Sequence, residues 1–237
     1  YRLITKQLKQ LLKQFPVVCI TGPRQSGKTT LVKNTFPEAD YVSLEDPDLR
    51  AFAKEDPRGF LGMYESLPVI LDEVQRVPEL FSYIQTIVDN KEKEGLYILT
   101  GSFHFGLMEG ISQSLAGRAA LLELLPFSFE ELNKAQKVPD SPEELIFKGC
   151  YPRIYDKAVE PSIWYANYIA TYIERDVKEI LNIRDSLQFR NFLTLLANRT
   201  GQEVNYSSLS KESGLDMRTL KSWISVLETS GIIYILQ

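Results

Sequence analysis

The sequence predicts a three-layer α/β protein with a parallel sheet, followed by a mainly helical segment. Short apolar runs without polar alternation are typical of strands buried on both faces of a parallel sheet, and Val17–Thr21, Val69–Leu71 and Tyr97–Thr100 are such runs. Helical patterns of ten or more residues separate strands in this part, as in repeated βαβ units with right-handed crossovers. A glycine-rich loop joins the first run to a helical pattern at 29–34.

The other elements follow from spacing and from helix breakers. Leucines and a phenylalanine at three- and four-residue spacing predict an amphipathic helix within Leu3–Phe15, which ends before Pro16. The remaining elements of this part are a second strand at Tyr41–Leu44, an irregular helical region at Pro47–Tyr64, a helix at Leu80–Asn90 and a fifth strand at Ala119–Leu125.

The pattern divides the chain into three segments. Residues 1–133 form the α/β core, and residues 134–187 read as a helical lid because a long helical pattern covers Ser162–Leu181. Residues 188–237 predict a winged helix-turn-helix, in which Gly214 ends one helix, Asp216 caps the next, and Ile232–Leu236 begins a wing. We expect a fragment of a longer protein, because the sequence starts without Met and stops within this wing.

Charge and composition exclude several classes. Lys and Arg total 27 against 31 Asp and Glu, so the net charge of -4 does not attract polyanions to the whole molecule. No apolar run reaches the roughly 18 residues that a transmembrane helix requires. Cys19 and Cys150 lack metal-ligand spacing, and no apolar leader is present at the start, so we expect a cytoplasmic protein.

A phosphate-binding loop is the strongest motif. Residues 22–29 fit GxxxxGK[ST] without deviation, with the sequence Gly22-Pro23-Arg24-Gln25-Ser26-Gly27-Lys28-Thr29. The two glycines allow backbone N–H groups to surround phosphate oxygens at a helix N-terminus. Lys28 supplies charge to the β- and γ-phosphates, Thr29 is a hard ligand for Mg²⁺, and Thr30 helps to hold the α-phosphate. Arg24 is either a phosphate ligand or a solvated cation.

Two acidic residues complete the predicted site. Asp72 and Glu73 follow the strand at Val69–Leu71, at the end where α/β sheets bind ligands. Asp72 would hold the Mg²⁺ water shell, and Glu73 would orient or deprotonate the attacking water. One additional strand, Tyr41–Leu44, separates the two motifs along the chain. This order, together with Glu73, favours hydrolysis of ATP over phosphorylation of a small acceptor.

Two further positions are candidates for catalysis. Ser102 ends the Thr-Gly-Ser turn after the fourth strand and would sense the γ-phosphate, while His104 is an alternative for that role. Arg118 precedes the fifth strand, and we expect it near the same sheet edge, where its guanidinium would neutralise phosphoryl charge. It would act within its own subunit or across a homo-oligomer, and a structural salt bridge is the competing interpretation.

With these residues assembled, the chain resembles the AAA+-like P-loop ATPases of bacteria and archaea that carry an uncharacterised C-terminal domain. The resemblance rests on GPRQSGKTTL, VILDEVQ, LTGS, SLAGR, GCYPRIY and YIERDV. It implies an additional-strand P-loop core, a helical lid, a winged helix, and ATP as the nucleotide. It also implies that Pro152 and Arg153 approach the nucleotide, whereas Phe103 departs from the family's usual amide and weakens the assignment of the sensor.

The predicted recognition helix carries four candidate DNA contacts, Arg218, Thr219, Lys221 and Ser222. Charges from Arg199 onward balance, which leaves a protein partner as the competing interpretation. The leading hypothesis is a Mg²⁺-dependent ATPase that moves its lid and winged helix, with double-stranded DNA as one candidate partner. The alternative is a nucleotide-gated protein-binding switch with negligible hydrolysis and no DNA binding.

Overall fold

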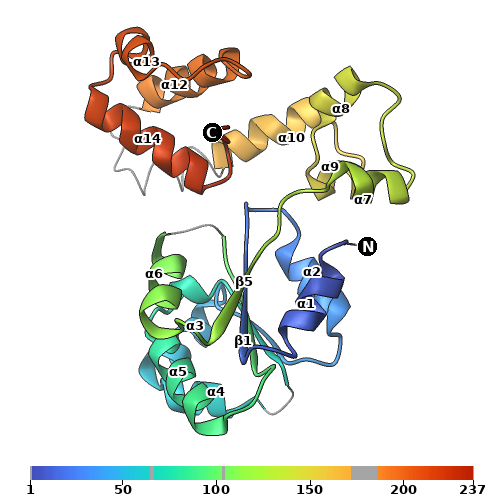
Figure 1. Ribbon diagram of the computed structural model, residues 1–237, viewed down its shortest axis with the longest axis vertical. Helices are drawn as coiled ribbons and strands as arrows, with labels where there is room; N and C mark the ends of the chain where they lie inside the picture. The colour runs from blue at the N-terminus through green and yellow to red at the C-terminus, as the bar shows by residue number, and fades with distance from the viewer. Residues whose placement is uncertain (1, 65–66, 103–104, 172–185, 237) are drawn as a thin grey trace. The chain divides into compact units, whose positions relative to one another are not determined.

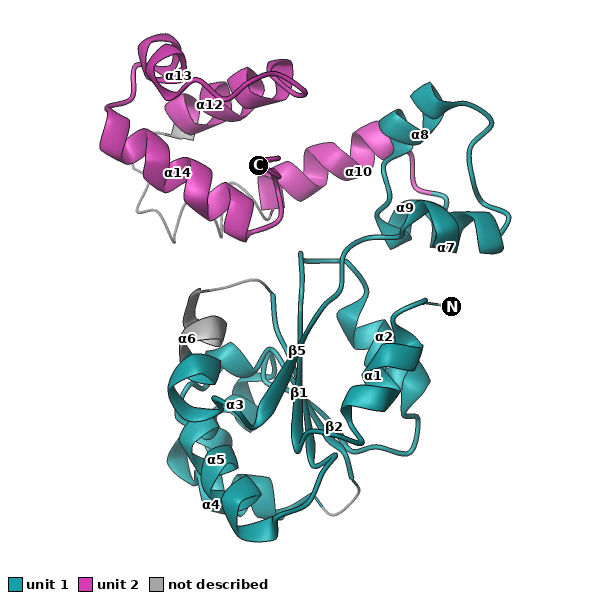
Figure 2. Cartoon of the chain, viewed as in Figure 1, with its two compact units in different colours: residues 1–158 teal, residues 159–237 magenta. Residues whose placement is uncertain are grey.

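The computed structural model describes residues 2–64, 67–102, 105–171 and 186–236. The chain divides into two compact units, residues 1–158 and 159–237, and each is described by itself (Figure 2). No helix in the described ranges has both the length and the apolar composition that crossing a bilayer requires.

The first unit is built on a five-stranded parallel sheet (Figure 1). Its strands are β1 (Val17–Thr21), β2 (Tyr41–Ser43), β3 (Val69–Asp72), β4 (Tyr97–Thr100) and β5 (Ala119–Glu123). Their order in space is β2-β3-β4-β1-β5, and every neighbouring pair is parallel. The predicted α/β class with five parallel strands is therefore confirmed.

The register of the sheet decides which residues meet. Ile20 and Asp72 both lie opposite Thr100, so the carboxyl ends of β1, β3 and β4 form one edge. At the other edge Val17 lies opposite both Tyr97 and Ala119. Although β2 falls between the two motifs along the chain, it is an edge strand in the sheet. The strand that separates β1 from β3 in space is β4.

Helices cover both faces of the sheet (Figure 1). The strands β1, β3 and β4 are buried along their whole length, so alternate residues enter two separate apolar clusters. On one face the cluster includes residues of α1 (Thr5–Leu11) and α2 (Lys28–Thr35). On the other face it includes residues of α3 (Pro47–Glu55), α4 (Pro57–Gly62), η1 (Val74–Arg76), α5 (Leu80–Lys91) and α6 (Phe105–Ser114). This is the three-layer arrangement that the sequence predicts.

The irregular helical region predicted at 47–64 is two helices, α3 and α4, and each starts at a proline. The side chains of Asp46 and Asp56 cap them by accepting hydrogen bonds from N–H groups of the first turn. Because Asp56 ends α3 and caps α4, the chain changes direction there. The two helices thus cover the sheet with different axes.

The first unit continues beyond β5 with α7 (Phe129–Lys134), α8 (Pro142–Lys148) and α9 (Pro152–Asp156). Ser128 caps α7 in a capping box, since its hydroxyl accepts from the Glu131 N–H while Glu131 accepts from the Ser128 N–H. The Phe127 N–H donates to the Cys150 carbonyl over 2.8 Å, which holds α9 close to the end of β5.

The second unit is helical, with α10 (Pro161–Tyr168), α12 (Ser186–Asn198), α13 (Tyr206–Ser213) and α14 (Met217–Thr229). Its apolar interior includes Phe189, Phe192 and Trp223, whose rings meet edge to face. Gly214 adopts a left-handed conformation with φ 68° at the end of α13, and Asp216 caps α14. The helix boundaries predicted at these two residues are therefore found.

The strand predicted at 232–236 is wrong, because the described residues of this segment form no strand. The N–H groups of Ile232 and Ile233 instead donate to the carbonyl of Leu227 near the end of α14. The helix predicted over Ser162–Leu181 is described only in its first part, as α10, and its positions from 172 onward lie outside the described residues.

Candidate phosphate-binding site

The loop between β1 and α2 needs glycine at both motif positions. Gly22 has φ 147°, and a Cβ there would lie 2.1 Å from the carbonyl oxygen of Leu124 on the neighbouring chain segment. Gly27 has φ 96°, in the left-handed region, and immediately precedes α2. Any larger residue would have to move the backbone at Gly22 and would be strained at Gly27. The loop geometry thus explains the spacing of the motif.

Lys28 is buried in the centre of this loop. Its Nζ donates to the carbonyl oxygens of Gly22 and Pro23, each over 2.9 Å, and only 6% of the residue is exposed. Burial lowers the pKa of Lys28 to about 8, although the charges of Glu73 and Asp72 oppose that change. The ammonium group is thus already on the inner side of the loop, held only by backbone carbonyls.

Two hydrogen-bond donors of the loop are available to bind an anion. The Ser26 hydroxyl is fully buried and is one of the two buried side-chain atoms without a hydrogen-bond partner among the described residues. Across the same ranges, the N–H of Gly27 has no acceptor. Because a buried donor is rarely left without a partner, the Ser26 hydroxyl indicates a ligand that accepts hydrogen bonds, and the half-buried Gly27 N–H can donate to the same ligand.

The remaining positions of the predicted phosphate site differ in exposure. Arg24 is half-buried, Gln25 and Thr30 are exposed, and Pro23 is buried. Arg24 is close enough for its charge to act on Lys28.

Asp72 accepts hydrogen bonds from three hydroxyl groups. Thr29 Oγ1 donates to its Oδ2 over 2.8 Å, and the Tyr41 hydroxyl donates to the same oxygen over 2.6 Å. Thr100 Oγ1 donates to Oδ1. Burial and this hydrogen bond raise the pKa of Tyr41, so the phenol stays a donor. The carboxylate is thus fixed in orientation from three different elements.

The sequence analysis missed both Tyr41 and Thr100 as parts of this site. Thr100 belongs to the Thr-Gly-Ser turn, but the prediction chose Ser102 from that turn. Tyr41 carries no motif, and only the strand order brings it beside Asp72.

Glu73 has an unusual backbone for its residue type. Its φ of 57° and ψ of 42° are left-handed, a conformation that a non-glycine residue rarely adopts. Gln75 Nε2 donates to Glu73 Oε2 over 2.5 Å, while Gln75 Oε1 is buried without a partner among the described residues. Burial raises the pKa of Glu73, and the ammonium of Lys28 opposes this. The carboxylate is therefore held close to the loop by Gln75, which the sequence analysis also missed.

Ser102 is buried two residues beyond β4, at the same edge of the sheet as the loop. His104, the alternative sensor, lies outside the described residues. Pro152 begins α9 and comes close to the loop, since its Cγ is 3.8 Å from where a Cβ of Gly27 would be. Arg153 is exposed on α9.

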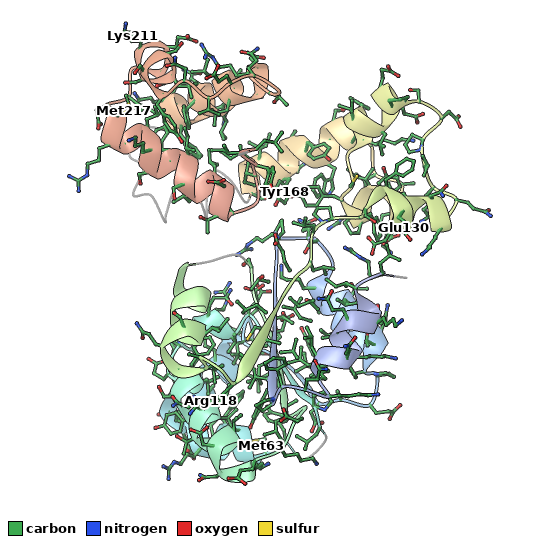
Figure 3. All side chains as sticks on the ribbon, in the orientation of Figure 1. Met63, Arg118, Glu130, Tyr168, Lys211 and Met217 are labelled. Atoms are coloured by element: carbon green, nitrogen blue, oxygen red, sulfur yellow. The ribbon has the colours of Figure 1, made fainter. Side chains whose placement is uncertain are left out.

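Arg118 is not near this site, and the expectation that it lies at the same sheet edge is wrong. It precedes β5, and the amino ends of parallel strands gather at the edge opposite the loop (Figure 3). There its Nε is 2.5 Å from Asp89 Oδ1, and its Nη2 is 2.9 Å from Asp89 Oδ2. A direct role for Arg118 in the loop of its own subunit is therefore excluded by the topology.

The predicted nucleic-acid contacts lie on α14. Arg218, Lys221 and Ser222 are exposed along one side of this helix. Thr219 is half-buried, and its hydroxyl donates to Asp216 within the helix cap. Three of the four residues are thus accessible, while the fourth has a local structural role.

No group of three or more His, Cys, Asp or Glu residues able to bind a metal occurs within the described part of the chain. The Thr29 hydroxyl and the Asp72 carboxylate nevertheless lie side by side, and both are hard oxygen ligands. Such a pair fits Mg²⁺, which commonly takes few protein ligands and completes its shell with water and phosphate.

The sequence matches two family models. Residues 14–133 match the sequence family described as AAA domain, and residues 140–237 match a domain of unknown function. The chain is 28% identical over 232 residues to an uncharacterised protein of Mycobacterium tuberculosis, covering 96% of this chain and 51% of that protein. It is 26% identical over 268 residues to an uncharacterised protein of Methanocaldococcus jannaschii, covering 92% and 56%. The chain thus spans about half the length of the curated relatives it matches.

Among solved structures, the chain is similar to the Walker-type ATPase PABY2304 of Pyrococcus abyssi, with a TM-score of 0.60. The two share 15% identity, and the match covers 95% of this chain and 88% of the other. At this identity the likeness concerns the fold.

Proposed function

The chain belongs to the AAA domain family of P-loop ATPases, and from this premise we propose that it binds Mg²⁺–ATP at the loop between β1 and α2 and hydrolyses it. The observation that carries the proposal is the convergence of Lys28, Thr29, Asp72 and Glu73 around one loop with unsatisfied donors.

The residues of the loop bind and orient the triphosphate. The free N–H of Gly27 and the hydroxyl of Ser26 donate to phosphate oxygens, and Lys28 exchanges its two backbone carbonyls for the β- and γ-phosphates. Thr29 and Asp72 would hold Mg²⁺, which would supply positive charge to the phosphates. The Tyr41 and Thr100 hydroxyls keep the Asp72 carboxylate oriented.

Glu73 accepts a proton from the attacking water, because its buried carboxylate lies next to the loop and is a stronger base than an exposed one. Gln75 must then release or share that carboxylate, since it donates to one of its oxygens. Ser102 aligns the water from the adjacent strand β4.

Arg118 supplies its guanidinium to the nucleotide of a neighbouring copy in a homo-oligomer. The support for this is its distance from the loop of its own subunit and its exposed ion pair with Asp89, which a neighbour can replace. Pro152 and Arg153 close over the nucleotide from α9, as the lid of the site.

The helices α13 and α14 of the second unit form a helix-turn-helix that responds to nucleotide state, and DNA is the partner that the exposed face of α14 favours. Arg218 and Lys221 are one turn apart on this face. If they contact phosphates, affinity for a duplex falls steeply with salt, and replacing either residue lowers the salt slope by about one. Lys93→Ala, an exposed lysine of the first unit, is the matched control. A duplex affinity that is independent of salt contradicts this part of the proposal.

A second function is favoured by one observation: Gln75 already occupies the Glu73 carboxylate. The chain would then use ATP as a switch ligand with negligible hydrolysis and regulate a partner protein.

Steady-state phosphate release distinguishes the two functions. In the ATPase, Glu73→Gln retains ATP binding and loses hydrolysis, while Lys28→Ala loses binding, as measured by calorimetry. Glu79→Gln, a nearby exposed glutamate, is the matched control and should retain both. Phosphate release that Glu73→Gln does not change would remove Glu73 from the mechanism. If the unmodified protein binds ATP but releases no phosphate, the nucleotide-gated switch is the function that remains.

A further inference from the structure

Arg2, far from the loop in sequence, is fixed against its outer side. All three guanidinium nitrogens are used: Nη1 donates to the Ser26 carbonyl over 3.0 Å, Nη2 donates to the carbonyls of Leu125 and Pro126, and Nε donates to Glu131. The guanidinium carbon also lies 5.0 Å from the ring centroid of Phe127. The Arg2 side chain is 12% exposed, so this is a buried and fully used cation.

Glu131 fixes Arg2 in turn. Its Oε1 is 3.0 Å from Arg2 Nε and 2.8 Å from the Leu3 N–H, while Oε2 accepts from the Ser128 N–H over 3.0 Å. The Glu131 side chain is 5% exposed. Because three donors hold this carboxylate, it is an anchor for the guanidinium rather than a mobile surface partner.

The hydrogen bond from Arg2 to the Ser26 carbonyl fixes the orientation of the Ser26–Gly27 peptide. The Ser26 carbonyl and the Gly27 N–H belong to one planar trans peptide, so they point in opposite directions. When Arg2 holds the carbonyl on the outer side, the Gly27 N–H is held toward the inner side, where it has no acceptor among the described residues.

This peptide is also the one most free to turn. Gly27 has no Cβ and adopts φ 96°, so rotation of the Ser26–Gly27 peptide meets little steric resistance from its own residue. A rotated peptide would present a carbonyl oxygen, instead of an N–H, to a phosphate. Arg2 opposes that rotation with a charged hydrogen bond.

We infer that Arg2 is a positioning residue for phosphate recognition: anchored by Glu131, it holds the Ser26–Gly27 peptide with its N–H toward the phosphates. The inference rests on the proposed function, since it concerns the same loop. Arg2 touches the loop backbone and neither the phosphates nor the nucleoside. Its effect is therefore on every ligand with a polyphosphate group, with or without a base.

The test uses Arg2→Gln in the full chain and two probes, Mg²⁺–ATP and Mg²⁺–tripolyphosphate, with binding measured by calorimetry. If the variant leaves the correct peptide orientation populated at about 10%, both probes bind about tenfold more weakly, by the same factor. The NMR signal of the Gly27 amide proton should shift on addition of tripolyphosphate in the unmodified protein and shift less in the variant. A purely structural role of Arg2 would not reduce the shift of the Gly27 amide signal on ligand binding.

The matched control is Arg199→Gln, which removes an arginine paired with Glu212 in the second unit. It should lower the melting temperature and leave both affinities unchanged. Glu131→Gln keeps an acceptor for the α7 cap but removes the charge that anchors Arg2, so it should weaken both probes about threefold, in the same direction as Arg2→Gln. This second variant tests the inference even if Arg2→Gln does not fold.

The outcomes separate cleanly. The inference is overturned if the folded Arg2→Gln variant binds both probes as tightly as the unmodified protein does, or if Glu131→Gln leaves both affinities unchanged. Weaker ATP binding with unchanged tripolyphosphate binding also overturns it, because Arg2 would then contact the nucleoside. If the unmodified protein binds neither probe, the proposed function fails instead.

Discussion

Lys28 offers the sharpest test of the site, because the same residue is expected to weaken the empty protein and to create its affinity for phosphate. The residue is 6% exposed, and within the described part of the chain its ammonium donates only to backbone carbonyls. Lys28→Met keeps the length of the side chain and removes the charge. We expect this variant to bind no nucleotide and to be more stable than the unmodified protein at neutral pH.

The magnitude follows from the pKa. Lowering the pKa of Lys28 from 10.5 to about 8 corresponds to a cost of about 3 kcal/mol for the charged form. The two hydrogen bonds to Gly22 and Pro23 offset this by about 1 kcal/mol each. The net gain of Lys28→Met near pH 7 is therefore about 1 kcal/mol, or about 2–4 °C in melting temperature for a chain of this size.

The sign of the pH dependence is fixed by the direction of the shift. Below pH 8 the lysine is protonated in both states, so the full cost is present. Between pH 8 and 10.5 the unfolded chain binds more protons than the folded chain, so the stability of the unmodified protein rises with pH. The advantage of Lys28→Met should therefore shrink by about 1 kcal/mol between pH 7 and pH 9.

Chemical unfolding without nucleotide at pH 7, 8 and 9 measures this difference. Lys9→Met, which replaces an exposed lysine on α1, controls for the loss of one positive charge. The reasoning is refuted if Lys28→Met is the less stable protein at pH 7, or if its difference from the unmodified protein is the same at all three pH values. Mg²⁺–ATP should raise the stability of the unmodified protein and leave Lys28→Met unchanged.

Three further predictions concern individual contacts. Gly22→Ala should lower stability by about 2–4 kcal/mol, since its Cβ would lie 2.1 Å from the Leu124 carbonyl oxygen; an unchanged melting temperature would contradict the loop geometry. Tyr41→Phe removes one donor to Asp72 without removing the ring, and we expect about three- to tenfold more Mg²⁺ for half-maximal hydrolysis; an unchanged Mg²⁺ dependence would show that the phenol does not orient the carboxylate. Arg118→Ala should bind ATP normally but hydrolyse it slowly, and mixing it with inactive Lys28→Ala should restore hydrolysis, because each copy supplies what the other lacks; mixtures as inactive as their parts would rule out action across subunits.

The fold was predictable because its signals are local. Buried strands such as Val17–Thr21 are continuous apolar runs. The turn at Gly22–Gly27 requires glycine at both ends, which is the spacing of the phosphate-binding motif. Local signals fail at 232–236, where an apolar run donates its N–H groups back to Leu227 instead of forming a strand.

The site was predictable only in part, because several of its contacts depend on strand order. Tyr41 and Thr100 reach Asp72 since β2 and β4 flank β3, an order that spacing along the chain does not reveal. Arg118 was misplaced for a different reason. A residue just before a parallel strand lies at the amino edge of the sheet, so the direction of β5 alone would have corrected the prediction.

The charges around the loop bear on the proposed role of Arg118 in a neighbouring copy. The charges of Lys28 and Arg24 both act on the Glu73 carboxylate, Asp72 adds a second negative charge, and the incoming Mg²⁺–triphosphate complex is itself anionic. Arg2 cannot contribute there, because its guanidinium is committed to Glu131 and to carbonyls on the outer side of the loop. If a neighbour's guanidinium neutralises the negative charge that develops on the transferring phosphoryl group, as proposed, hydrolysis depends on assembly. This reasoning requires that turnover per chain rise with protein concentration in the unmodified protein but not in Arg118→Ala.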